Sequence, residues 1–131
     1  MRRAMELAEL GRGWTKTNPV VGAVLVKEDR IIGEGYHKKY GELHAERNAI
    51  ASLTESAEGA VIYVTLEPCI MCSGAVVQSR IRRVFFGAYD IENGYMASNF
   101  VPGLKLPECY CGIMEEECKS ALVKFFDKLR K

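Results

Sequence analysis

The amino-acid sequence predicts an α/β fold, specifically a three-layer α/β/α sandwich around a mixed sheet of about five strands. Four short apolar runs, rich in β-branched residues, have the length and composition of strands, namely 20–26, 31–36, 60–66 and 83–87. Helical patterns at 44–53 and about 68–79 separate the later strands, so part of the sheet is expected to be parallel and covered on both faces. With 131 residues, the chain is expected to form a single domain, 1–131.

The N-terminal half is predicted to contain a helix followed by a hairpin. Residues 2–10 place their apolar side chains on one helical face, and Gly11 and Gly13 end the segment. The first two strands are joined by the polar turn 27–30, which is typical of a hairpin. In the later helix that starts near residue 68, Pro68 suits the first turn, because its ring fixes the backbone in a helical conformation.

The C-terminal part is predicted to contain a long loop and a final helix. Residues 88–107 are rich in Gly, Asn, Pro and Ser, so this segment is expected either to be a functional loop or to carry a short helix of its own, and it is where substrate selectivity is expected to lie. The final helix, 114–129, begins with glutamates and ends with basic residues, which suits the helix dipole. Its predicted buried stripe consists of Met114, Cys118, Ala121, Leu122, Phe125, Phe126 and Leu129.

Composition and charge constrain the class of protein more than its partner. The net charge of +1 argues neither for a strongly basic nucleic-acid binder nor against a local basic patch. No uninterrupted apolar run follows the first arginines, so we expect neither a signal peptide nor a membrane span, and we expect a cytoplasmic protein. Of the five cysteines, Cys109, Cys111 and Cys118 are expected to be buried thiols rather than a second metal site.

Two short segments carry the predicted chemistry, His44-Ala45-Glu46 and Pro68-Cys69-Ile70-Met71-Cys72. Zinc favours histidine nitrogen and cysteine sulfur, and a catalytic zinc keeps three protein ligands so that water can take the fourth position. His44, Cys69 and Cys72 supply these three ligands. Glu46 lies two residues after the histidine, where its carboxylate can lie beside the metal-bound water, so it is expected to be the catalytic residue that moves protons.

Three other interpretations remain open from the residues alone. A closed structural zinc site needs a fourth ligand, and His37 and Cys111 are the candidates. The C-x-x-C sequence after a strand is also typical of a dithiol redox protein, although such a protein needs neither His44 nor Glu46. A nucleic-acid-binding module without catalytic activity is disfavoured, because the chain has no recognised RNA-binding signature and no basic run.

The combination of H-x-E with P-C-x-x-C resembles the zinc-dependent nucleobase deaminases, which form the cytidine deaminase-like superfamily. This resemblance implies a hydrolase that acts on the C–N bond of a cyclic amidine in a nucleobase-containing substrate. It also implies zinc as the cofactor and a homodimer that assembles through the zinc-site face.

The N-terminal half is similar to the deaminase of riboflavin synthesis, which acts on a diaminopyrimidine ribosyl phosphate. In that family the residues that match Asn18 and His37 contact the substrate, so the resemblance implies that both bind substrate here. The longer cysteine loop of that family is absent from this chain. The similar segments are Thr17-Asn18-Pro19-Val20-Val21-Gly22-Ala23-Val24 and Gly33-Glu34-Gly35-Tyr36-His37.

The C-terminal half resembles the bacterial tRNA adenosine deaminase. On this ground the sequence favours deamination of adenosine to inosine in tRNA, with an anticodon loop as partner. The riboflavin-pathway pyrimidine or a free nucleobase is the alternative substrate. The similar segments are Cys69-Ile70-Met71-Cys72-Ser73-Gly74-Ala75, Ser79-Arg80-Ile81, Phe86-Gly87-Ala88, Asp90, Gly112-Ile113-Met114 through Cys118, and Phe125-Phe126 with Arg130.

Overall fold

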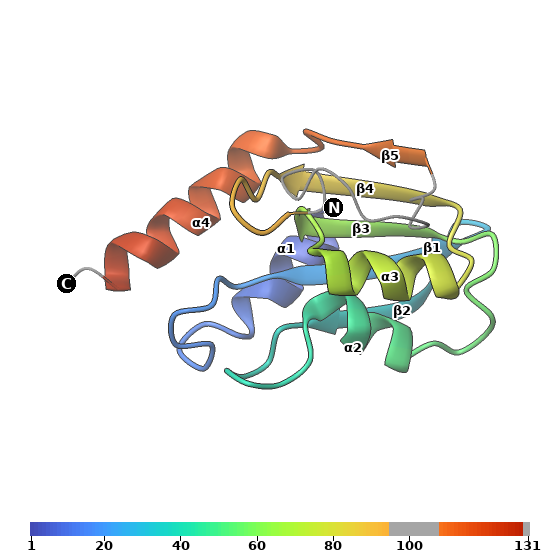
Figure 1. Ribbon diagram of the computed structural model, residues 1–131, viewed down its shortest axis with the longest axis horizontal. Coiled ribbons are helices and arrows are strands. Elements are labelled where there is room, and N and C mark those ends of the chain that lie inside the picture. Colours follow the sequence, from blue (N-terminus) through green and yellow to red (C-terminus); the bar gives the residue numbers. More distant parts are fainter. Residues whose placement is uncertain (95–107, 130–131) are drawn as a thin grey trace.

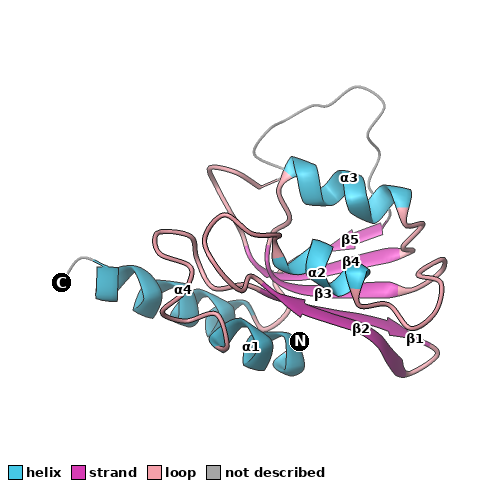
Figure 2. Cartoon of the chain, turned by 90° about the horizontal axis from the view of Figure 1, so that it is seen from below, coloured by secondary structure: helices cyan, strands magenta, loops and turns pink. Residues whose placement is uncertain are grey.

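The computed structural model describes residues 1–94 and 108–129 of the chain. In this part, five strands form one mixed sheet in the order β2-β1-β3-β4-β5. Helices α2 and α3 cover one face of the sheet, and α1 and α4 lie on the other face (Figure 1, Figure 2). The predicted three-layer α/β/α architecture with about five strands is therefore confirmed.

The sheet contains an antiparallel and a parallel part. β1 (Gly22–Lys27) pairs antiparallel with β2 (Arg30–Tyr36) on one side and with β3 (Val61–Leu66) on the other. β3 pairs in parallel with β4 (Arg83–Ala88), and β4 pairs in parallel with β5 (Glu108–Tyr110). Parallel neighbours need a crossover connection, and α3 provides it between β3 and β4.

Four helices are described, and each was predicted to within two residues of its ends. They are α1 (Arg2–Glu9), α2 (Ala45–Ala51), α3 (Ile70–Gln78) and α4 (Glu115–Leu129). Among these residues, no helix has the length and apolar character that a membrane crossing requires.

The main core lies between the sheet and the layer formed by α2 and α3. Gly33 and Gly35 of β2 allow α2 to approach closely, because a Cβ atom on either glycine would overlap the α2 backbone at Ala49. This close approach brings the start of α2 to the end of the sheet where β3 leads into α3 (Figure 1). Buried residues from both layers form this core, among them Ala23, Leu25, Ala45, Ala49, Ile62, Val64, Val76 and Val84.

Two predictions about burial in the C-terminal part are wrong. Cys118 is buried, but Cys109 and Cys111 are exposed, because Cys109 lies in the edge strand β5, whose three residues are all exposed, and Cys111 directly follows it. In α4, Phe125 is buried against α1, whereas Phe126 is 40% exposed. The helix packs on the sheet mainly at β4, so only part of the predicted stripe is covered.

Two further predictions fall partly on residues that the structure does not describe. The predicted loop 88–107 is described only as far as Gly94, and its remainder lies outside the described residues. The side chain of Leu129, which was placed on the buried stripe of α4, is also outside them. Strand β5 was not predicted, because three residues are too few to show a strand periodicity.

Candidate active site

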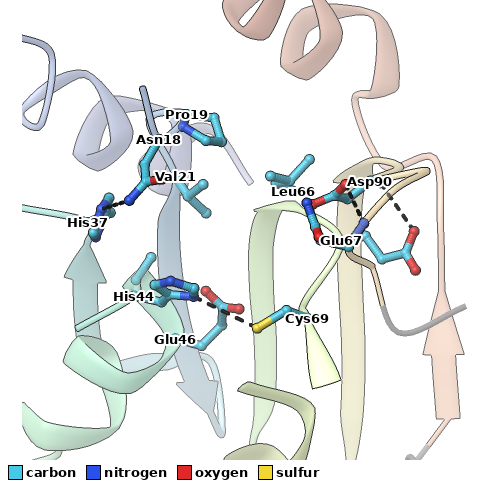
Figure 3. A pocket seen from close by; sticks show the side chains of 12 residues that line it. Asn18, Pro19, Val21, His37, His44, Glu46, Leu66, Glu67, Cys69 and Asp90 are labelled. Carbon is cyan, nitrogen blue, oxygen red and sulfur yellow. Dashed lines mark hydrogen bonds between the residues drawn. The ribbon is translucent and has the colours of Figure 1, made fainter. Parts of the chain in front are cut away.

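The candidate site lies where two helices begin beside each other. His44 directly precedes α2 and Cys69 directly precedes α3, and both residues have an extended backbone, with φ/ψ of −69°/165° and −74°/172°. From these positions the His44 and Cys69 side chains point toward each other (Figure 3). β3 leads into this region at its carboxyl end, the edge at which α/β sheets commonly bind ligands.

His44, Cys69 and Cys72 form one compact group, named the metal-binding group because it could hold a metal ion. The His44 Nδ1 atom lies 3.5 Å from Cys72 Sγ and 3.8 Å from Cys69 Sγ. All three ligand atoms lie within 4.8 Å of one another. Zn–N and Zn–S bonds at a tetrahedral angle place nitrogen and sulfur about 3.6 Å apart, so the spacing fits a tetrahedral zinc site. Cys72 is fully buried and the other two residues are partly exposed, which leaves one side of the group accessible.

Hydrogen bonds within the group favour a thiolate at Cys69. Hydrogen bonds from Cys72 and His44 lower the pKa of Cys69 to about 4. The same interactions raise the pKa of Cys72, because its proton is shared with Cys69, and raise the pKa of His44. Thiolate is the form of cysteine that binds a metal, so Cys69 is prepared for coordination.

Glu46 lies in the first turn of α2 and is only 4% exposed. Its carboxylate lies beside the His44 ring and near Cys69 (Figure 3). Burial disfavours the charged form and raises the pKa of the Glu46 carboxyl. A carboxyl group of raised pKa holds a proton more readily than an exposed one, which suits a side chain that accepts a proton and releases it again.

Asn18 and His37, the two predicted substrate-binding residues, contact each other at the pocket wall. His37 Nδ1 lies 3.1 Å from the Leu43 carbonyl oxygen, which can only accept, so Nδ1 carries the proton. His37 Nε2 therefore accepts a hydrogen bond from Asn18 Nδ2 at 3.2 Å. Each ring nitrogen of His37 thus forms a hydrogen bond within the protein, so His37 is not available as a fourth ligand for a closed zinc site.

Cys111, the other candidate for a fourth ligand, lies elsewhere. It follows the edge strand β5, and its sulfur accepts a hydrogen bond of 2.5 Å from the Tyr89 hydroxyl. Among the described residues, the group that could hold a metal contains His44, Cys69 and Cys72 and no fourth member. The group therefore has the three-ligand composition of a catalytic rather than a closed structural zinc site.

A pocket of about 180 Å³ adjoins this group and collects all but one of the predicted site residues. Asn18, His37, His44, Glu46 and Cys69 line it (Figure 3), while Cys72 is buried in α3 and is not part of the lining. Three further polar residues of the wall were not predicted as site residues. Each of these follows the carboxyl end of a parallel strand, which is the signal that could have identified them, and they are Glu67, Asp90 and Asn93.

Comparison with known proteins identifies the family. The sequence model of the cytidine and deoxycytidylate deaminase zinc-binding region matches residues 1–88. The chain belongs to the cytidine deaminase-like superfamily. Its members are zinc-dependent hydrolytic deaminases, so zinc is the cofactor of this deaminase fold and the group in α2 and α3 fits it. The alternative of a dithiol redox protein has no support, because the two cysteines share one group with His44.

Several relatives of this deaminase belong to riboflavin synthesis. The chain is 42% identical to riboflavin biosynthesis protein RibD of Actinobacillus pleuropneumoniae over 96% of its length, but spans 35% of that protein. It is 38% identical to the diaminohydroxyphosphoribosylamino-pyrimidine deaminase of Buchnera aphidicola, over 99% of this chain and 93% of that protein. The chain thus spans about a third of the RibD relative and nearly all of the Buchnera deaminase.

Among solved structures, one from the riboflavin pathway and one from a tRNA deaminase study are both similar to this chain. The bifunctional deaminase/reductase of Thermotoga maritima matches 99% of this chain and 40% of its own, with 38% identity and a TM-score of 0.84. A structure from a study of A-to-I editing by tRNA:A34 deaminases matches 93% of this chain and 100% of its own, with 32% identity and a TM-score of 0.71.

Proposed function

We propose that this protein catalyses the hydrolytic deamination of a diaminopyrimidine ribosyl phosphate. The observation that carries this proposal is the hydrogen-bonded pair of Asn18 and His37 beside the metal-binding group. The sequence alone favoured adenosine in tRNA, and we now reverse that order. The relatives named for the pyrimidine match the C-terminal half as well as the N-terminal half.

The pair presents a hydrogen-bond acceptor to the pocket. Because the Asn18 amide nitrogen donates to His37, the orientation of the Asn18 side chain is fixed. Within residues 1–94 and 108–129, its Oδ1 atom accepts no hydrogen bond. Asn18 is half-buried at the pocket wall, and a fixed acceptor that faces the pocket favours a substrate with N–H donors, of which an aminopyrimidine carries several.

The reaction requires one metal ion and one proton carrier. We assign His44, Cys69 and Cys72 as zinc ligands; bound zinc supplies a water molecule whose pKa is lowered toward about 7. Glu46 takes a proton from the attacking water and passes it to the ring nitrogen as oxygen bonds to the amine-bearing carbon. Glu46 then takes the proton of the newly attached hydroxyl group and passes it to the amine, so that the C–N bond breaks as the C=O bond forms and ammonia leaves.

The loops beside Asn18 and His37 carry positive charge suited to a phosphate. Lys16 precedes Asn18, Lys38 and Lys39 follow His37, and all three are exposed. The two loops are joined by a 3.0 Å hydrogen bond from the Tyr40 backbone nitrogen to the Trp14 carbonyl oxygen. Lys16 lies 5.3 Å from the centre of the Tyr40 ring, a further contact between the loops. This charge supports a phosphorylated substrate in either candidate class.

Adenosine in tRNA is the second candidate substrate. It is favoured by the tRNA-type segments around Cys72 and in α4, and by the similarity to the structure from the tRNA:A34 deaminase study. An enzyme of this class must hold the nucleotides that flank the target base, in addition to the base itself. Phosphate contacts would then make its activity strongly dependent on salt.

The substrate is decided by measuring ammonia release from the pyrimidine ribosyl phosphate, an anticodon stem-loop, and free adenine, cytosine and guanine. We expect the ribosyl phosphate to have the highest kcat/KM. Asn18→Ala is expected to lower its kcat/KM at least tenfold, because the fixed acceptor is lost. His37→Ala should have a similar effect, because it releases Asn18.

Two results would contradict this ordering. The first is a higher kcat/KM for the stem-loop that falls as salt rises. The second is an unchanged kcat/KM for the pyrimidine in both variants. Glu42→Ala serves as the matched control, because Glu42 is exposed in the same loop as His37 but does not line the pocket.

We also propose a homodimer that assembles through the zinc-site face. Apolar side chains are exposed where α3 begins and in the turn near the pocket, with exposed fractions of 38% for Ile70, 53% for Met71 and 86% for Ile91. Met71→Glu is expected to shift the protein toward the monomer in sedimentation experiments, because it charges an apolar contact. Val123→Glu is the control, because this residue is 57% exposed on α4, across the sheet. A monomeric wild-type protein would contradict the proposal.

We further propose that the protein works in the cytoplasm. None of the five cysteines forms a disulfide, and Cys109 and Cys111 are exposed. Exposed thiols near one another stay reduced in a reducing compartment, which supports this location.

A further inference from the structure

Glu67 is a buried carboxylate that the proposed chemistry does not use. It follows β3 directly, precedes Pro68 and Cys69, and is only 5% exposed. Its backbone nitrogen donates a 2.8 Å hydrogen bond to the Ala88 carbonyl oxygen, so pairing between β3 and β4 continues past the strand end. Glu67 therefore lies between the segment that carries a metal ligand and the segment that follows β4.

The Glu67 side chain holds the turn 89–94. Its Oε1 atom accepts a 3.2 Å hydrogen bond from the Asp90 backbone nitrogen (Figure 3). Asp90 also accepts hydrogen bonds from later residues of this turn. Its Oδ1 atom accepts hydrogen bonds from the backbone nitrogens of Glu92 and Asn93, at 3.3 Å and 3.0 Å, and its carbonyl oxygen accepts one from Gly94 at 2.9 Å.

Gly94 connects the same turn to Cys69. A Cβ atom at this position would lie 2.6 Å from the Asp90 carbonyl oxygen and would overlap the Glu67 carboxylate even more closely. The backbone of Gly94 forms an isolated antiparallel bridge with Cys69. The turn is thus attached at one end to the carboxylate and at the other to a residue of the metal-binding group.

We propose that Glu67 is a positioning residue that fixes the turn 89–94 against the Cys69 segment. Asp90 and Asn93 of this turn line the pocket, and Asp90 lies across it from Asn18 and His37 (Figure 3). Through the turn, Glu67 sets the distance between this wall and the reacting group, so its loss loosens substrate binding while the metal ligands stay in place. A test by KM rests on the proposed function, because it uses the pyrimidine ribosyl phosphate. A test by amide hydrogen exchange does not depend on the substrate.

The first experiment compares Glu67→Ala with Glu67→Gln in the zinc-loaded protein. Alanine removes the acceptor for the Asp90 amide, so KM for the pyrimidine ribosyl phosphate is expected to rise about tenfold, with kcat within about threefold. Glutamine keeps an oxygen acceptor at Oε1 and is expected to keep KM within about threefold. Zinc content should stay at about one per chain in both variants, because Glu67 is not a ligand.

A second pair of variants tests the contact between Glu67 and the turn by changing Gly94 instead of Glu67. Gly94→Ala places a methyl group against the Glu67 carboxylate and should reproduce the rise in KM. Gly74→Ala is the matched control, because a Cβ atom there meets nothing within 4 Å and Gly74 lies in helix α3. If both glycine variants have the kinetics of the wild type, the proposed contact does not position the turn.

Amide hydrogen exchange at Asp90 provides a readout that is independent of the substrate. Exchange is expected to be at least tenfold faster in Glu67→Ala and in Gly94→Ala, and unchanged in Glu67→Gln and in Gly74→Ala. Unchanged exchange in Glu67→Ala overturns the role of Glu67, as does zinc loss in that variant. If wild-type protein does not turn over the pyrimidine, the proposed function fails, and the exchange result still decides the role of Glu67.

Discussion

Glu46→Ala is expected to lose nearly all turnover while keeping zinc and the fold. General acid–base catalysis by one side chain is worth about a hundredfold to ten-thousandfold, and Glu46 is assigned every proton transfer of the cycle, so we expect kcat to fall at least about a thousandfold. Ammonia release measures kcat, and metal analysis should still find about one zinc per chain. The melting temperature is not expected to fall, because burial already disfavours the charged carboxylate.

Two comparisons separate proton transfer from other roles of Glu46. Glu46→Gln keeps the size of the side chain but cannot carry a proton, so it should be as inactive as the alanine variant. Glu42→Ala, in the exposed loop before α2, should keep wild-type kcat. Loss of zinc from either Glu46 variant would mean that this carboxylate is a ligand, and the assigned mechanism would then be wrong.

His44→Ala or Cys72→Ala is expected to remove both the metal and the activity. The zinc content should fall from about one per chain to less than about a tenth of that, because two remaining ligands hold zinc weakly. Turnover should fall at least about a thousandfold, since the activated water is lost with the metal. Both variants should also melt at lower temperature, because the free energy of metal binding contributes to the free energy of folding.

Cys111→Ser is the matched control for these ligand variants. Cys111 is an exposed cysteine outside the metal-binding group, so its replacement should leave zinc content and melting temperature unchanged. A chelator should lower the melting temperature of the wild type and of Cys111→Ser, but not that of His44→Ala. Full zinc content in Cys72→Ala would show that Cys72 is not a ligand.

The position of each metal-binding residue at the start of its helix could be predicted because its determinants are local in sequence. A strand followed by Pro68 and a helical pattern places Cys69 at the start of α3, and Cys72 follows one turn later. His44 and Glu46 are likewise fixed by the start of α2. These relations depend on backbone geometry within a few residues, which the amino-acid pattern alone specifies.

The structure was needed for residues whose environment depends on distant segments. Burial of Cys118 and exposure of Cys109 follow from which strand is at the edge of the sheet and which strand α4 covers. Phe126 shows the same limit, because a helical stripe does not reveal how much of it a neighbouring layer covers. The periodicity of a helix shows which of its side chains share a face. It does not show how much of that face the neighbouring layer covers.

The sequence by itself determined the α/β class, the described helices, four of the five described strands, the His44, Cys69 and Cys72 group that could hold a metal, and the deaminase resemblance, because these depend on local pattern and residue chemistry. Only the tertiary structure brought Asn18 to His37 and Glu67 to Asp90 and Gly94. These contacts arise where β3 and β4 run in parallel and where the loops before β1 and α2 meet. Such proximity depends on strand order and layer packing, since these decide which distant segments share the pocket wall.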